Sequence, residues 1–189
     1  MSEKHSKSPS ARLFVALDLP DALRAGLAAW GGEALDDPAL RPVPAESLHI
    51  TLAFLGHRPP DEIEPIATVV RGLSAPRIEL GDPVARPERG RPRLFALPAH
   101  SPELGRLQAT LLERLAGAGL HEAERRPFWP HVTVARVRPR SVPGPLPSLP
   151  PGLRDAWLGV RAVFYRSVLQ PSGSTYFPLA QVELSRGQQ

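Results

Sequence analysis

The chain of 189 residues contains no cysteine and almost no lysine. Without cysteine it can form no disulfide bond, thiolate nucleophile or sulfur-ligated metal site, which fits a reducing compartment. Lys4 and Lys7, both near the N-terminus, are its only lysines. Walker-type phosphate loops, Schiff-base enzymes and nucleotidyl-lysine ligases all need a lysine in the folded body. The sequence therefore argues against these classes of enzyme.

Long apolar runs are also missing from the chain. No stretch approaches the roughly 18 consecutive apolar residues that a membrane helix needs, and the N-terminus lacks the apolar segment of a signal peptide. We therefore expect a cytoplasmic protein with no membrane contact. We predict a disordered tail over residues 1–11, a single domain over 12–185 and a short C-terminal tail over 186–189.

The positive charge of the chain is carried almost entirely by arginine. The 23 Lys and Arg residues exceed the 19 Asp and Glu residues, which gives a formal net charge of +4 and a pI near 10.3. This suits an anionic partner, because the planar guanidinium can donate two hydrogen bonds to one phosphate. Biased codon usage equally produces a composition rich in arginine and poor in lysine, so composition alone does not identify a partner.

Apolar periodicity predicts strands and helices that alternate along the chain. Strands are expected at 13–17, 49–56 and 131–137, in a hairpin region between 77 and 97 with a basic tip, and in a closing hairpin of 162–170 and 175–184. Helices are expected to begin at Pro20, Asp61 and Ser101-Pro102 and to end at Gly31-Gly32, Gly72 and Gly117. The proline-dense stretch 138–152 predicts an extended surface loop, or alternatively a docking segment for a proline-reading domain.

Two stretches of the chain repeat one pattern. His49 and Thr51 open one β-branched, apolar run, and His131 and Thr133 open another. On a strand the two residues share a face, because side chains alternate. The chain has only six histidines, and a packing position gains nothing from imidazole that leucine would not supply better. The repeat therefore indicates a duplicated α+β unit in which one histidine from each half serves a joint function.

Two histidines and two threonines fit acid–base chemistry at phosphorus. With an ordinary pKa of about 6.5, one imidazole can act as a base while the other acts as an acid near neutral pH. One would take a proton from water and the other would protonate the departing oxygen, and a strained cyclic phosphodiester suits this chemistry. A metal site is disfavoured because neither motif contains a carboxylate, and serine hydrolase chemistry because Gly-x-Ser-x-Gly is absent.

The motifs and their flanks resemble the 2H phosphoesterase superfamily, and within it the RNA 2′,3′-cyclic phosphodiesterases of the ThpR/LigT type. The similarity lies in residues 12–20, 48–56, 126–136, 165–169 and 173–176. The resemblance implies a bilobal, duplicated α+β fold, with two small, mainly antiparallel sheets flanked by helices around a central cleft. It also implies hydrolysis of RNA 2′,3′-cyclic phosphate ends to 2′-phosphomonoesters, with no metal and no cofactor.

The same resemblance implies roles for individual residues. His49 would be the general acid, His131 the general base, and Thr51 and Thr133 the phosphate donors. Arg136 matches a family arginine near the phosphate. On a regular strand Arg136 points away from His131 and Thr133, so its role needs a bend or bulge, or else the residue is structural.

The sequence defines the contacts with RNA less sharply. Arg126 could contact the backbone, and several aromatic residues could stack the terminal base: Phe54, Phe128, Trp129 and Tyr176. Aromatic residues at such positions also serve as core residues. The expected partners are RNA 3′ ends, or nucleotides bearing a 2′,3′-cyclic phosphate. No obligate protein partner is expected, and the protein is predicted to be a monomer.

Other functions stay open at the level of the sequence. The same histidines could support reversible 2′-5′ RNA ligation, or hydrolysis of a small cyclic nucleotide or a 2′,5′-linked oligonucleotide. A non-catalytic module that binds RNA or a nucleotide is the alternative outside the enzymes. The presence of both complete His-x-Thr motifs favours turnover over binding alone.

Overall fold

The computed structural model describes residues 11–121, 127–170 and 173–186. The strands of this part are β1 (Ala11–Asp18), β2 (Leu40–Pro42), β3 (His49–Arg58), β4 (Arg77–Leu80), β5 (Val84–Arg86), β6 (Leu94–His100), β7 (His131–Val137), β8 (Trp157–Leu158), β9 (Arg161–Gln170) and β10 (Gly173–Glu183). The predicted tails lie almost wholly outside the described residues, although Ala11 begins β1 and Arg186 is described. The division into one domain and two tails stays a prediction.

The strands form one continuous path in the order β10-β9-β1-β3-β7-β6-β4-β8, with β2 beside β7 and β5 beside β6. In the described part of the chain, the pairings between these strands are antiparallel. The path joins two halves through a short contact between β3 and β7, where Ile50 is the register partner of Val132. The predicted α+β fold class is thus confirmed, and the two predicted sheets meet at the strands that carry the His-x-Thr motifs.

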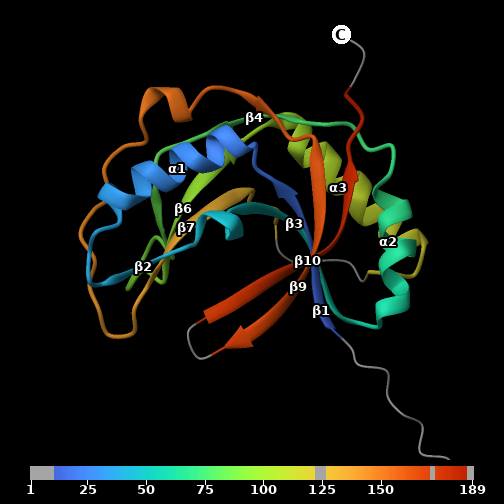
Figure 1. The fold of residues 1–189 in the computed structure, drawn as a ribbon, viewed down its shortest axis with the longest axis horizontal. Helices are drawn as coiled ribbons and strands as arrows, with labels where there is room; N and C mark the ends of the chain where they lie inside the picture. Colours follow the sequence, from blue (N-terminus) through green and yellow to red (C-terminus); the bar gives the residue numbers. More distant parts are fainter. Residues whose placement is uncertain (1–10, 122–126, 171–172, 187–189) are drawn as a thin grey trace, which may run out of the picture.

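Three α-helices in the described residues cover this path on its convex side (Figure 1). They are α1 (Asp21–Ala34), α2 (Ile63–Val70) and α3 (Pro102–Gly117). α2 packs against β9, β10 and α3, whereas α3 also contacts β3 and β4. α1 lies over the other half and contacts two 3₁₀ turns, η1 (Ala45–Ser47) and η3 (Pro151–Leu153). None of the described helices is long and apolar enough to cross a membrane.

The helix boundaries follow the sequence signals with one exception. Ser101 caps α3, where its Oγ accepts a hydrogen bond from the Leu104 amide at 3.0 Å. α2 begins after the 3₁₀ turn η2 (Pro60–Glu62), as the acidic residues predicted. The prediction that α1 ends at Gly31-Gly32 is wrong, because the helix continues to Ala34. Burial of Leu35 against Gly31 outweighs the roughly 1 kcal/mol by which a glycine disfavours a helix relative to alanine.

The remaining segments connect these elements as predicted. β5 and β6 form the hairpin with the basic tip, and β9 and β10 form the closing hairpin. Residues 141–150 have no regular secondary structure, which confirms the predicted loop. This loop is anchored by Leu149, whose side chain is buried and whose amide donates to the Asp82 carboxylate at 2.9 Å.

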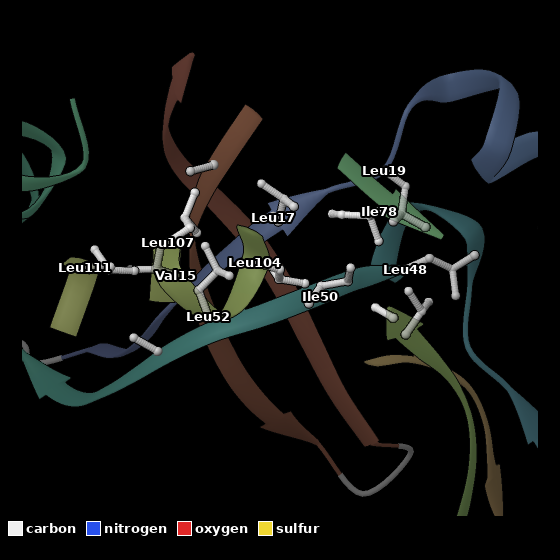
Figure 2. Packing of buried hydrophobic residues seen from close by; sticks show 14 of the residues in the cluster. Val15, Leu17, Leu19, Leu48, Ile50, Leu52, Ile78, Leu104, Leu107 and Leu111 are labelled. Carbon is white, nitrogen blue, oxygen red and sulfur yellow. The ribbon is translucent and has the colours of Figure 1, made fainter. Parts of the chain in front are cut away.

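The two faces of β1 separate the main core from the concave side of the sheet. Figure 2 shows Val15 and Leu17 among Leu104 and Leu107 of α3 and Ile50 of β3. The alternating residues Phe14 and Ala16 instead join a second, smaller cluster with Val163, Tyr165 and Tyr176. Because side chains alternate along a strand, the same eight residues build the core and one wall of the concave face.

Candidate active site

A β-bulge in β7 decides which of its side chains share a face. Thr133 is the register partner of Ala96, and Ala135 is the partner of Phe95, so Val134 has no partner in β6. Val134 and Ala135 are consequently both buried, and Arg136 returns to the face of Thr133. The bulge that the role of Arg136 required is therefore present.

The first motif contains the same irregularity. In the pairing of β3 with β1, Thr51 is the partner of Ala16 and Ala53 is the partner of Val15, which leaves Leu52 as the bulged residue. Leu52 and Ala53 are both buried, and Phe54 follows on the face of Thr51. Each strand thus presents His, Thr and a third residue to one side. The third residue is Phe54 in the first half and Arg136 in the second.

These faces line a cavity of about 550 Å³ that both halves of the sheet enclose. Within the described residues its lining includes the histidine and threonine of both motifs, three arginines and no carboxylate. The polar and aromatic lining residues are Arg12, Phe14, Arg41, Ser47, His49, Thr51, Phe54, His131, Thr133, Arg136, Ser167, Ser174, Thr175 and Tyr176. This excess of positive charge suits an anion.

Three aromatic rings surround the imidazole of His49. Its ring centroid is 5.1 Å from that of Phe14, 5.3 Å from Tyr176 and 5.8 Å from Tyr165. Its Nδ1 is 2.7 Å from the Ser47 carbonyl oxygen, and its Nε2 is 3.2 Å from Thr51 Oγ1.

His131 is held by one stacked aromatic residue and one carbonyl. Its Nδ1 is 2.7 Å from the Trp129 carbonyl oxygen. The Trp129 ring lies on the imidazole with centroids 3.9 Å apart and planes at 18°, and the Arg86 guanidinium covers Trp129 at 4.3 Å. The second histidine therefore has one stacked ring covered by an arginine, whereas the first has three aromatic rings around it.

The backbone contacts fix the tautomer of both imidazoles. A carbonyl oxygen can only accept a hydrogen bond, so Nδ1 of His49 donates to Ser47 and Nδ1 of His131 donates to Trp129. In the neutral imidazole Nε2 then carries the lone pair. At His49 this nitrogen accepts from the Thr51 hydroxyl. Each half of the site therefore offers an Nε2 that can take or give a proton.

Burial keeps both imidazoles neutral in the unliganded protein. It lowers the pKa of His49 from 6.5 to about 4, against the raising effects of the Ser47 carbonyl and the Asp18 carboxylate. His131, when it is protonated, and Arg24 lower this pKa as well. Burial also lowers the pKa of His131, assisted by Arg86 and Arg136 and opposed by the Trp129 carbonyl. A bound anion would raise the pKa of either imidazole, because it stabilises the charged form.

We expect the imidazole of His49 to titrate with a midpoint near 4 in the unliganded protein and at higher pH when inorganic phosphate is bound. Between pH 4 and 6.5 the unfolded chain binds a proton that the folded protein does not, so the free energy of unfolding should fall as the pH is lowered through this range. NMR of the histidine ring carbons measures the midpoint, with a His49→Gln variant to assign the signal. A midpoint near 6.5 without phosphate would contradict this.

A sequence model described as the 2′-5′ RNA ligase superfamily matches residues 19–161. The chain belongs to this superfamily. The match confirms the resemblance to the 2H phosphoesterases that the paired motifs indicated. Both His-x-Thr strands lie inside the matched range.

The chain is similar to several other proteins. It is 34% identical over 186 residues to the RNA 2′,3′-cyclic phosphodiesterase of Thermus thermophilus, covering 92% of this chain and 90% of the relative. The crystal structure of TT0787 from Thermus thermophilus has a TM-score of 0.78 at 28% identity, covering 94% of this chain and 100% of that one. LigT of Escherichia coli complexed with 3′-AMP has a TM-score of 0.71 at 27% identity, covering 95% of this chain and 100% of that one.

Most of the site residues predicted from the sequence line the cavity, but not all of them. Trp129 stacks on His131 and is absent from the cavity lining, while Phe128 is half-buried against the hydrophobic core. Arg126 lies outside the described residues. Tyr176 and Phe54 line the cavity, and Phe54 is 57% exposed.

Several lining residues escaped the sequence analysis. Arg41 lies on β2, where it is the register partner of Arg136, but a three-residue strand carries too little periodicity to reveal this. Arg12 and Phe14 also line the cavity, and both lie on β1. The only sequence signal for Phe14 is its position on the face of that strand opposite to Val15 and Leu17. As for metals, no group of three or more His, Asp or Glu side chains in the described ranges could hold an ion.

Proposed function

We propose that the protein hydrolyses RNA ends bearing a 2′,3′-cyclic phosphate to 2′-phosphomonoesters, without a metal, by acid–base catalysis with His49 and His131. One observation carries this proposal: two imidazoles from opposite halves, each with Nδ1 fixed on a backbone carbonyl, line one arginine-rich cavity that contains no described carboxylate. The name of the Thermus thermophilus relative supports the choice of substrate.

The proposed reaction is an in-line displacement at phosphorus. Nε2 of His131 takes a proton from water as the water oxygen bonds to phosphorus. The bond from phosphorus to the 3′ oxygen breaks, and protonated His49 gives its Nε2 proton to that oxygen. The 3′ hydroxyl is restored and the phosphate stays on the 2′ oxygen. Thr51 and Thr133 donate hydrogen bonds to the phosphoryl oxygens, and Arg136 balances their charge.

Different charged groups act on the two histidines. Arg86 and Arg136 beside His131 disfavour its charged form, which suits a base. Asp18 beside His49 favours the charged form, which suits an acid, while burial, His131 and Arg24 disfavour it. The pKa of His49 is nevertheless about 4 without ligand. The acid therefore acquires its proton together with the anionic substrate, whose charge raises that pKa.

We place the terminal base against the aromatic side of the cavity. Phe54 is the most exposed of the large hydrophobic side chains there, and Tyr176 lines the same cavity. An exposed aromatic ring can stack any base, because every base has a π face. The partners proposed are accordingly RNA 3′ ends or nucleotides with a 2′,3′-cyclic phosphate. The cytoplasmic location and the monomeric state stay predictions from the sequence.

Reversible 2′-5′ RNA ligation is the second candidate, because the matching family model is described as a 2′-5′ RNA ligase superfamily. The same displacement serves for ligation, with a 5′ hydroxyl attacking phosphorus in place of water. The bond from phosphorus to the 3′ oxygen breaks, and the products are a 2′-5′ phosphodiester and a 3′ hydroxyl. Hydrolysis of small cyclic nucleotides or 2′,5′-linked oligonucleotides needs no further groups either. A non-catalytic binding module would gain nothing from two imidazoles with orientated Nε2 atoms.

One experiment separates these functions. The purified protein is incubated in EDTA with RNA ending in a 2′,3′-cyclic phosphate, with cyclic mononucleotides, with a 2′,5′-linked oligonucleotide, and with a pair of RNAs for ligation. We expect conversion of the RNA end to a 2′-phosphomonoester, recognised by its sensitivity to phosphatase. Binding without turnover would favour the module. Turnover that occurs without EDTA and is lost when EDTA is added would contradict the metal-independent mechanism.

A further inference from the structure

Asp18 is a buried carboxylate that lies outside the cavity. It is 8% exposed at the end of β1, and it is the register partner of His49 across β1 and β3. A buried carboxylate must be neutralised and hydrogen-bonded. Arg161 donates to its Oδ2 from Nε at 3.0 Å and from a terminal nitrogen at 2.6 Å, and Arg24 donates to its Oδ1.

Arg24 connects Asp18 to the turn that precedes the first motif. From α1 its guanidinium donates to the carbonyls of Ala45 at 3.0 Å and Leu48 at 3.3 Å, and to that of Leu19 at 3.2 Å. Ala45 and Leu48 bracket the 3₁₀ turn η1. The planar guanidinium thus ties the end of β1 to both ends of the turn, which a lysine ammonium could not do with one rigid group.

The turn held in this way supplies the hydrogen bond that orients His49. Ser47, its last residue, accepts from Nδ1 of His49 at 2.7 Å. At the second motif the carbonyl of Trp129 has the same task, but there the support is the stacked ring of Trp129 under Arg86. The two histidines are therefore oriented alike and supported by different means.

We propose that Asp18 and Arg24 are positioning residues for His49, which fix the turn 45–48 so that the Ser47 carbonyl holds the imidazole with Nε2 towards the cavity. This rests on the proposed function, in which His49 is the general acid. Neither Asp18 nor Arg24 lines the cavity, so neither touches the substrate. Their removal should affect the turnover step more than binding, because a small displacement of a proton donor slows the reaction without removing a contact to the substrate.

Asp18 adds a charge to this geometric role. The charged and titratable groups around His49 are Asp18 on β1, Arg24 on α1, His131 on β7 and the tyrosines Tyr165 on β9 and Tyr176 on β10. Asp18 raises the pKa of His49, whereas Arg24 and His131 lower it. Asparagine at position 18 would keep much of the hydrogen bonding and lose the negative charge.

The test uses Arg24→Lys and Asp18→Asn in the full chain, with Asp82→Asn as the matched control. Asp82 likewise accepts a hydrogen bond from an arginine, and it also accepts one from a backbone amide. It does not line the cavity. We expect kcat on the cyclic-phosphate RNA end to fall about 10- to 100-fold in Arg24→Lys, with KM within about 2-fold. In Asp18→Asn the NMR titration midpoint of His49 should move to lower pH. Asp82→Asn should change neither quantity.

Several outcomes would overturn the proposal. They are a kcat within about 2-fold of the parent in folded Arg24→Lys, an unshifted His49 midpoint in Asp18→Asn, or an equal loss in Asp82→Asn. Thermal unfolding shows whether each variant folds. If Arg24→Lys does not fold, Arg161→Lys weakens the support of Asp18 with Arg24 in place and should give a smaller fall in kcat. If the parent shows no turnover, the proposed function fails, but the His49 midpoint still tests the positioning.

Discussion

Replacement of either His49 or His131 with alanine is expected to lower kcat for hydrolysis of the cyclic-phosphate RNA end by about 10²- to 10⁴-fold. Each variant loses one of the two proton transfers, while the threonines and arginines that line the cavity still bind the phosphate. KM should therefore change much less than kcat. Steady-state kinetics on a defined RNA end, in EDTA and across pH 5 to 8, provides both constants.

The matched control for these variants is His57→Ala. His57 lies on β3 like His49, but it is exposed and does not line the cavity, so turnover should stay at the parent level. The bell-shaped pH profile expected of the parent should lose one limb in each catalytic variant. Unchanged turnover in both His49→Ala and His131→Ala would rule out the paired-histidine mechanism, as would equal losses in all three variants.

The largest effect on stability is expected for Ile50→Ala. Ile50 is fully buried between His49 and Thr51, and its register partner Val132 is fully buried too. This pair is the point where β3 meets β7 and the two halves of the sheet join. Truncation would leave a cavity there, so the free energy of unfolding should fall by about 2–5 kcal/mol. Urea denaturation of parent and variant measures the difference.

Val142→Ala is the control for that substitution. Val142 is 78% exposed in the proline-dense loop, so its truncation should change the free energy of unfolding by no more than about 0.5 kcal/mol. A loss of less than about 1 kcal/mol in Ile50→Ala would show that the junction of β3 and β7 contributes little to the stability of the fold.

The sequence predicted the parts of the fold that depend on local periodicity. α3 begins where Ser101 and Pro102 signal it, and the two His-x-Thr stretches form strands that meet. α1 continues beyond Gly31-Gly32 because Leu35 is buried against Gly31. Helix propensity alone does not include this effect of tertiary packing.

The sequence predicted the part of the site that depends on the regular alternation of side chains along a strand. His49, Thr51, His131 and Thr133 line one cavity, as alternation places each pair on a common face. Arg136 joins them only because of the bulge at Val134, which depends on pairing with a neighbouring strand and leaves no mark in the sequence of β7 itself. The support from Arg24 was hidden for the same reason, since it bridges segments that only the tertiary fold brings together.

The bulges at Leu52 and Val134 place a third residue beside the histidine and threonine of each motif. Each motif keeps its histidine and threonine on one face, while the residue after the bulge is placed there by backbone geometry and not by its own identity. Substitution of Phe54 or Arg136 would therefore leave the reacting groups on their face of the sheet. One half has an apolar ring at this position and the other has a cation, so the two halves make different kinds of contact with a single asymmetric ligand.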